Sequence, residues 1–409
     1  MLAVDPVAPL GLYVHLPWCV RKCPYCDFNS HAATDIPDHA YVAGLLTDLD
    51  HERTRVAGRV VESIFIGGGT PSLFSVSAIV ALLGGIRERV ELAPDCEVTL
   101  EANPGSAEAH RFAGYRAAGV NRLSIGVQSF DDAALRGIGR IHDARAAHQA
   151  VEIAQAAGME RINIDLMYGL PGQSWQAAAA DVKQALNHGV SHLSHYELTI
   201  EANTLFHRFP PARPDEDALW TMHTESIELM ESAGLRRYEI SAFARPGAEC
   251  RHNLNYWRFG DYLGIGAGAH GKLTRGADRI VERSVKHRHP RRYLASRGGG
   301  DHEARRGPVP AADLPLEFML NAARLLEGFS EALFEARTGL PASAISVPLV
   351  QAEKRGLIHR SRGAIRPTRR GTQFLNDYLM LFEDPSPASP PVDATKRAPV
   401  DRGGGSPVL

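Results

Sequence analysis

The sequence lacks the features of a secreted, membrane-spanning or nucleic-acid-binding protein. Only five of its 409 residues are cysteine, a number too small and odd for a disulfide scaffold, which predicts a reducing, cytoplasmic environment. No apolar run approaches the roughly 18 residues of a membrane-spanning helix, and the first residues carry no signal-peptide pattern. The formal net charge of −2 leaves no basic excess for nucleic acid. Any membrane contact is expected to be peripheral, through a partner.

What is present is an alternation of strands and helices with enough apolar residues, 44%, for a sizeable core. Strands are expected at 12–15, 61–66, 97–101, 122–127, 161–167 and 192–198, and helices at 37–56, 75–90, 107–118, 143–157, 175–187 and 216–233. This alternation predicts a parallel α/β sheet with right-handed crossovers. Six such units suit an incomplete, TIM-like (β/α)6 barrel, with a doubly wound sheet as the alternative.

The remaining sequence predicts further parts. Residues 1–205 form the expected barrel, and residues 206–310 an extension and connector, in which the basic stretch from Arg275 to Arg306 is expected to be an exposed loop. Residues 311–382 predict a small, mostly helical domain with a hairpin near 357–365, like a winged helix. Residues 383–409 are rich in proline and glycine and are expected to be a disordered tail.

Three of the cysteines lie together directly after the first strand. Their spacing is Cys19-x3-Cys23-x2-Cys26, and thiolates are ligands for iron–sulfur clusters or zinc. A [4Fe–4S] cluster held by three thiolates leaves one iron without a protein ligand, so that it can bind a substrate directly. Structural zinc, with His15 or a distant cysteine as the fourth ligand, is the alternative. Cys96 and Cys250 stand alone.

This cysteine pattern resembles the radical S-adenosylmethionine (radical SAM) superfamily, in which C-x3-C-x-aromatic-C follows the first strand of a six-unit barrel. The resemblance implies a [4Fe–4S] cluster on Cys19, Cys23 and Cys26. It also implies that the amine and carboxylate of SAM chelate the open iron, and that an electron from the cluster cleaves SAM to a 5′-deoxyadenosyl radical. The cofactors would supply the difficult chemistry and the protein the positions.

Polar or glycine residues also stand where the later strands end. Gly67-Gly68-Gly69-Thr70-Pro71 follows the second strand, Glu101 ends the third, Gln128 follows the fourth and Asp165 lies in the fifth. Barrel enzymes place their sites at these strand ends. The order is similar to the coproporphyrinogen III oxidase-like subfamily. That resemblance implies SAM contacts from Tyr13, Tyr25, Gly68, Gly69, Thr70, Glu101, Gln128, Arg140 and Asp165.

Two features discriminate within the subfamily. The oxidase has a further cysteine two residues after the third cluster cysteine, where this chain has Phe28, which implies that oxidase activity is lacking. Two parts of the sequence resemble the heme chaperones of the subfamily. They are the stretch His252-Asn253-Leu254-Asn255-Tyr256-Trp257 and the C-terminal block from Glu317 to Asp377. Their resemblance implies heme as cargo, delivery to heme-requiring respiratory proteins, and His252 as a candidate heme ligand.

Three functions remain open at this point: a heme chaperone carrying a cluster and SAM, an oxygen-independent coproporphyrinogen III oxidase, and a zinc-stabilised module without redox chemistry. Cys250 is a rival heme ligand to His252, although a lone cysteine more often packs as a small apolar residue. A cluster-dependent homodimer is a reasonable expectation.

Overall fold

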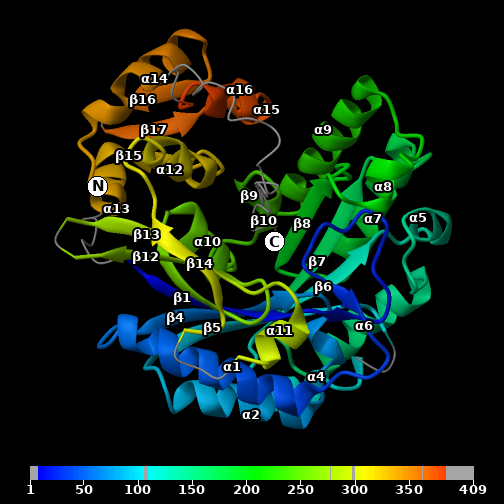
Figure 1. Cartoon of the computed structure of the whole chain (residues 1–409). Coiled ribbons are helices and arrows are strands. Elements are labelled where there is room, and N and C mark those ends of the chain that lie inside the picture. Colours follow the sequence, from blue (N-terminus) through cyan, green and yellow to red (C-terminus); the bar gives the residue numbers. More distant parts are fainter. Residues whose placement is uncertain (1–7, 106–108, 277, 297–299, 362, 384–409) are drawn as a thin grey trace.

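The computed structural model describes residues 8–105, 109–276, 278–296, 300–361 and 363–383. Its centre is a set of parallel strands whose order in the sheet is their order in the chain (Figure 1). These are β1 (Leu10–Leu16), β4 (Val61–Gly68), β5 (Leu92–Ala102), β6 (Arg122–Gln128), β7 (Arg161–Tyr168) and β8 (His192–Glu197). A doubly wound sheet reverses its strand order at a switch point, and no reversal occurs between β1 and β8. The barrel-type arrangement predicted from the sequence is therefore confirmed.

Helices connect the parallel strands. They are α1 (Asp38–Glu52), α2 (Val76–Arg87), α4 (Phe112–Ala118), α5 (Asp132–Gly137), α6 (Ala144–Ala156) and α7 (Trp175–Asn187), with 3-10 turns at Arg53–Arg55 and Pro71–Leu73. Two further helices, α8 (Leu205–Arg208) and α9 (Glu216–Ser232), follow β8. Several begin at a capping side chain: Ser75, Asp143, Ser174 and Asp215 each accept a hydrogen bond from the backbone N–H three residues later. The start predicted for α4, at residue 107, lies outside the described residues.

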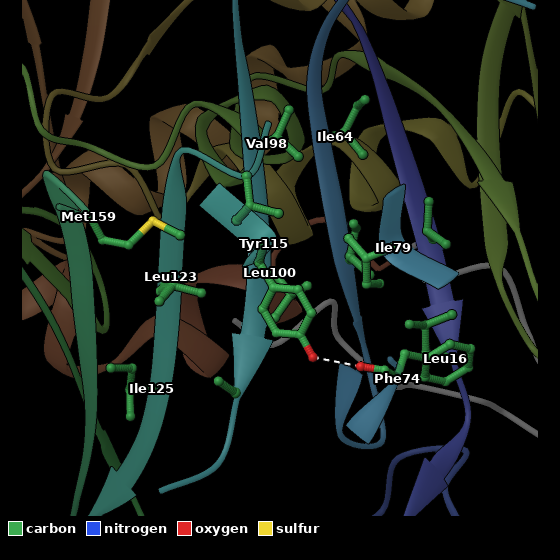
Figure 2. Close-up of a cluster of buried hydrophobic side chains, with 14 of the residues drawn as sticks. Leu16, Ile64, Phe74, Ile79, Val98, Leu100, Tyr115, Leu123, Ile125 and Met159 are labelled. Carbon is green, nitrogen blue, oxygen red and sulfur yellow. Dashed lines mark hydrogen bonds between the residues drawn. The ribbon is translucent and has the colours of Figure 1, made fainter. Parts of the chain in front are cut away.

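The main core lies between the helices and the outer face of the strands. Figure 2 shows part of it, to which β1, β4, β5, β6, α2 and α4 contribute Leu16, Ile64, Leu100, Leu123, Ile79 and Tyr115. The Tyr115 hydroxyl donates to the backbone oxygen of Phe74 at 2.6 Å, which fixes the turn that follows β4. Because side chains alternate along a strand, the intervening positions of each strand face the other way, and there they are mostly polar or glycine.

The sheet continues beyond the six parallel strands at both edges. Beside β1 lie β11 (Asp261–Ile265), β12 (His270–Arg275), β13 (Ile280–Lys286) and β14 (Glu303–Pro308), and beside β8 lie β10 (Ala242–Ala244) and β9 (Arg236–Glu239). β11 is parallel to β1, and the outer strands are antiparallel. A short helix, α11 (Pro290–Leu294), lies between β13 and β14.

The prediction of an exposed loop from Arg275 to Arg306 is therefore wrong. Its charged residues are not all solvated: Lys286 is fully buried and donates to Asp48 Oδ1 at 2.6 Å and to Glu52 Oε1 at 2.7 Å. Buried charges are tolerated when they are paired in this way. Lys286 and Arg306, whose charges suggest a surface in the sequence, are thus partners of acidic residues on α1.

A second core lies at the C-terminal end of the described chain. It is built by α12 (Leu314–Ala322), α13 (Glu331–Thr338), α14 (Ser343–Lys354), α15 (Arg369–Gln373) and α16 (Leu375–Met380), with the strands β15 (Phe329–Ser330), β16 (Ile358–Ser361) and β17 (Ala364–Pro367). The predicted hairpin is observed as β16–β17. The tail predicted to be disordered lies, from residue 384, outside the described residues. No helix in the described part of the chain is long and apolar enough to span a bilayer.

Candidate functional site

The three clustered cysteines lie on a loop that leaves the carboxyl end of β1. The base of the loop is closed by a short parallel pair, β2 (Trp18–Cys19) and β3 (His31–Ala32). Within the loop, the Cys26 N–H donates to the Cys23 backbone oxygen at 3.2 Å. All three thiols are free of disulfides. The loop thus presents three unlinked cysteines at the end of the barrel where sites of this fold are found.

Each of the three sulfurs has a polar neighbour of its own. The Thr70 hydroxyl donates to Cys19 Sγ at 3.4 Å, and an Arg140 Nη donates to Cys23 Sγ at 3.7 Å. The Ser30 hydroxyl lies 3.9 Å from Cys26 Sγ. Hydrogen bonds to the sulfurs are among the means by which a protein sets the potential of an iron–sulfur cluster. Each cysteine sulfur thus has a contact of the kind that would tune a cluster.

The placement of the three sulfurs bears on the zinc alternative. At Zn–S distances of about 2.3 Å, two thiolates on one zinc are at most about 4.6 Å apart. Among the described residues, only His51, Glu52 and Glu303 form a group whose ligand atoms all lie within 4.8 Å of one another, so at least one pair of the cysteine sulfurs is farther apart than that. A cluster accommodates this spread because each thiolate binds a different iron.

His15, a candidate fourth ligand in the zinc alternative, uses both ring nitrogens in hydrogen bonds within the protein. Its Nδ1 lies 2.9 Å from the Tyr13 hydroxyl and its Nε2 lies 2.9 Å from the backbone oxygen of Asn29. Burial lowers its pKa to about 4. His15 thus ties β1 to the end of the cysteine loop, and both of its ring nitrogens are occupied.

The glycine-rich turn after β4 packs directly on the cysteine loop. The Thr70 N–H donates to the Trp18 backbone oxygen at 2.8 Å, and a Cβ on Gly69 would lie 2.5 Å from that same oxygen. Gly68 has a φ of +119°, which disfavours any residue with a side chain. The glycines are required here because two backbone segments meet.

A cavity of about 250 Å3 lies between the cysteine loop and the strand ends. It brings together all but one of the predicted cluster and SAM residues: Cys19, Cys23, Tyr25, Cys26, Gly68, Gly69, Thr70, Glu101, Gln128, Arg140 and Asp165. Tyr13 is the exception, since it does not line the cavity. Phe28, which stands where the oxidase has a cysteine, lies on the rim and is 36% exposed.

Sequence reasoning missed several residues of the cavity. Asn103, Ser124, Gly126, Met167, Tyr196 and Glu197 also line it. Asn103 is central, because it accepts from Arg140 at 2.7 Å and donates to the Thr70 hydroxyl at 2.9 Å. For Ser124 and Gly126, the available signal was the period of two along β6, Ser124-x-Gly126-x-Gln128.

Two buried carboxyl groups face the cavity. Burial, reinforced by the neighbouring Asp165, raises the pKa of Glu101 to about 8, although the Gly68 N–H donates to it at 3.0 Å. Burial raises the pKa of Asp165 to about 6 against hydrogen bonds from Ser124 and Asn163. Burial thus disfavours the ionised form of both groups, and Glu101 is mostly protonated at neutral pH. A cation bound in the cavity would favour the ionised carboxylates.

Gln128 has an unusual backbone. Its φ is +70°, a conformation that costs free energy in a residue other than glycine. The Tyr196 hydroxyl donates to Gln128 Oε1 at 2.7 Å. The strain bends the chain at the end of β6 and turns the side chain into the cavity.

The opposite end of the barrel interior is filled. Glu97 on β5 is buried, and its Oε1 accepts from the Arg251 N–H at 2.8 Å at the start of α10 (Arg251–Trp257). Its Oε2 lies 3.5 Å from an Arg122 Nη and 3.2 Å from an Arg161 Nη. The segment that carries the His252 motif therefore closes the amino ends of the strands.

His252 lies in this closed end, not beside the cysteines. Its side chain is fully buried, with Nδ1 2.9 Å from the Ser63 hydroxyl and Nε2 2.9 Å from the Tyr256 hydroxyl. Burial lowers its pKa to about 3. Cys250 is also buried, and its Sγ is 3.6 Å from Glu97 Oε1. Heme ligation by His252 stays a prediction, and it would require the hydrogen bond at the ligating ring nitrogen to break.

Comparison with known proteins agrees with this geometry. Residues 13–185 match the radical SAM superfamily and residues 309–374 match the HemN C-terminal domain. The structure of coproporphyrinogen III oxidase (HemN) from Escherichia coli, described as a radical SAM enzyme, superposes with a TM-score of 0.76 over 93% of this chain and 91% of that one. At 23% identity, this likeness shows the fold.

Sequence relatives are closer. The heme chaperone HemW of Escherichia coli (strain K12) is 49% identical over 375 residues, which cover 91% of this chain and 98% of that protein. The heme chaperone HemW of Haemophilus influenzae is 47% identical over 379 residues, with the same coverage. A mouse protein named radical S-adenosyl methionine domain-containing protein 1, mitochondrial, is 44% identical over 270 residues, 64% of this chain and 61% of its own length. The chain therefore belongs to the heme chaperone HemW family of the radical SAM superfamily.

Proposed function

We propose that the protein is a heme chaperone that binds heme, delivers it to heme-requiring respiratory proteins, and carries a [4Fe–4S] cluster and SAM. One observation carries the cofactor part: three cysteines, whose sulfurs do not all lie within 4.8 Å of one another, line the same cavity as the predicted SAM residues. The names of the HemW relatives support heme as the cargo. The cluster and SAM, when bound, supply one-electron chemistry.

The chain's own residues have distinct roles in this proposal. Cys19, Cys23 and Cys26 hold the cluster. The backbone of Gly69 and the buried carboxyl of Glu101 face the space in which the methionine end of SAM would lie. The remaining residues proposed to contact SAM are Tyr13, Tyr25, Gly68, Thr70, Gln128, Arg140 and Asp165.

Charge supports this placement of SAM. SAM is a sulfonium cation, and Glu101 and Asp165 are the buried acidic groups opposite the cysteines. Arg140 lies beside Cys23 and is suited to a carboxylate, because a guanidinium binds carboxylates with paired hydrogen bonds. The sulfonium and the carboxylate of SAM would thus face acidic and basic side chains, respectively, on the cavity wall.

One anaerobically reconstituted sample tests the function. Iron and sulfide are quantified first, and a colourless preparation that holds zinc alone would overturn the cofactor assignment. Hemin is then titrated while the Soret band is recorded, and saturable binding is expected. A hemin-binding His252→Ala variant with an unchanged spectrum would remove His252 as a ligand.

The same sample distinguishes the chaperone from an oxidase. It is incubated with coproporphyrinogen III, SAM and a reductant, and no protoporphyrinogen is expected at an enzymatic rate. Catalytic decarboxylation would replace the proposed function with an oxygen-independent coproporphyrinogen III oxidase. The Phe28→Cys variant is the matched test of the residue that differs from the oxidase pattern.

A further inference from the structure

A group of aromatic, imidazole and guanidinium side chains lies outside the cavity, where α9 meets the C-terminal core. It comprises Tyr168, His195, Trp220, His223, Arg237 and Arg369, and is called the α9 cluster below. The Tyr168 ring stacks on His195 with centroids 4.7 Å apart, and the Trp220 and His223 centroids are 5.9 Å apart. The Arg369 guanidinium lies 5.7 Å from the Trp220 ring, so α15 and α9, which face each other in Figure 1, are in contact.

The α9 cluster borders the SAM cavity. Tyr168 ends β7, and its register partner on β8 is Glu197. Glu197 and Met167, the residue before Tyr168, both line the cavity. A ligand bound by the α9 cluster would therefore lie next to the [4Fe–4S] cluster and SAM, in a separate space.

His223 and His195 have ring nitrogens without hydrogen-bond partners among the described residues. His223 Nδ1 lies 3.1 Å from the Tyr168 hydroxyl, and within the described residues no hydrogen bond reaches His223 Nε2. His195 is only 4% exposed, yet neither of its ring nitrogens is hydrogen-bonded to a described residue. None of these nitrogens is among the buried atoms that lack a partner, so they remain accessible to solvent and to a ligand. His252, by contrast, has both nitrogens satisfied.

Both histidines are held in the neutral form. Burial, assisted by the guanidinium groups of Arg237 and Arg369, lowers the pKa of His223 to about 4. Burial also lowers the pKa of His195 to about 3, with smaller effects from His223 and Arg237. A neutral imidazole has a free lone pair and is the form that binds a metal.

We propose that the α9 cluster is a heme site, with His223 Nε2 as the iron ligand, the 38%-exposed Trp220 as an aromatic wall, and Arg369 as a partner for a propionate. The donor set matches the parts of heme: an imidazole for iron, an aromatic face for the macrocycle and a guanidinium for a carboxylate. This inference rests on the proposed function, because it locates the cargo of the chaperone. Placement at a contact between two parts of the fold also suits a cargo that must leave again.

Hemin titration of the holoprotein and its His223→Ala variant tests the site. Loss of the ligand is expected to weaken hemin binding about tenfold or more and to shift the Soret band. Added imidazole is expected to restore the wild-type spectrum to the variant, which a structural defect would not allow. His207→Ala is the matched control, because His207 is an exposed histidine on the neighbouring α8.

The outcomes separate this inference from the function on which it rests. No saturable hemin binding by the wild-type protein would overturn both. Wild-type binding with an unchanged affinity and spectrum in His223→Ala would overturn the α9 cluster site and leave the chaperone proposal standing. An effect of Arg369→Ala on inorganic phosphate binding, with none on hemin, would identify an anion site in place of a heme site. Thermal unfolding of each variant checks that the fold is kept.

Discussion

The Asn103 side chain accepts a hydrogen bond from Arg140 at 2.7 Å and, through its amide nitrogen, donates to the Thr70 hydroxyl at 2.9 Å. Thr70 in turn donates to Cys19 Sγ, and Arg140 donates to Cys23 Sγ. A single amide thus connects the polar neighbours of two cysteine sulfurs. The positions of these sulfurs and of the groups around them are therefore interdependent.

The positive charge of Arg140 should set the potential of a cluster on the three cysteines. An Arg140→Met variant removes a cationic donor from Cys23, which stabilises the oxidised cluster, so its reduction potential is expected to fall. Each tenfold change in this one-electron equilibrium corresponds to roughly 59 mV. Potentiometric titration followed by electron paramagnetic resonance measures the shift.

Two further variants calibrate that measurement. Asn103→Ala is expected to lower the potential by less, because it removes a support of Arg140 and keeps the charge. Arg136→Met is the control, since Arg136 is exposed on α5. An equal shift in the control would mean that overall charge, and not the contact with Cys23, is responsible.

The cysteines should divide into two groups. Alanine at Cys19, Cys23 or Cys26 is expected to abolish the cluster, because each sulfur would bind a separate iron. Alanine at Cys96 is expected to retain full iron and sulfide content, since Cys96 is buried near the amino end of the β5 core. Retention of a complete cluster in any of the first three variants would contradict the ligand assignment.

SAM binding should strengthen as the pH rises from 6 to 8. The pKa of Glu101 is raised to about 8 by burial and by Asp165, so the group is mostly protonated below that pH. A sulfonium cation favours the ionised form, and binding therefore releases a proton. Calorimetry in buffers of different ionisation enthalpy counts that proton.

The control ligand and variant for this pH dependence follow from charge. S-adenosylhomocysteine has no sulfonium cation, and its binding should change much less over the same range. Glu101→Gln should bind SAM more weakly, with a flatter pH profile. If the variant kept the wild-type profile, the titrating group would have to be another one.

The side chains that fill the amino end of the barrel should contribute to the free energy of unfolding. Glu97→Ala leaves Arg122, which is 1% exposed, without its carboxylate. Removal of one partner of a buried ion pair costs about 3 kcal/mol or more. Denaturant unfolding of the apo protein should show this loss. Asp95→Ala, which removes the exposed partner of Arg251, should leave the midpoint nearly unchanged.

The sequence was most informative where the apolar periodicity of a strand and a polar side chain at its end occur together. The six parallel strands follow from apolar periodicity, and the cavity residues Glu101, Gln128 and Asp165 follow from polar side chains at strand ends. Tyr13 shows the limit of this reasoning. It stands on the correct strand, but its hydroxyl meets His15, and a sequence pattern does not specify how far along the strand the cavity reaches.

The missed features depend on contacts between distant segments. β11 joins the sheet beside β1, yet about 250 residues separate their partners Leu10 and Asp261, and no local pattern encodes that pairing. Lys286 has the appearance of a surface residue until Asp48 and Glu52 are brought to it. His223 likewise gains its neighbours only when α9 packs beside β7 and β8.

The filled amino end of the barrel also affects the order in which ligands enter and leave the cavity. Within the described chain, Glu97, Arg122 and His252 pack that end with buried side chains, so traffic through it is blocked. Molecules therefore reach the cavity from the end of the barrel that carries the cysteine loop. A ligand that binds deep in the cavity is then expected to arrive before one that binds over it, and the outer ligand would govern how long the inner one stays.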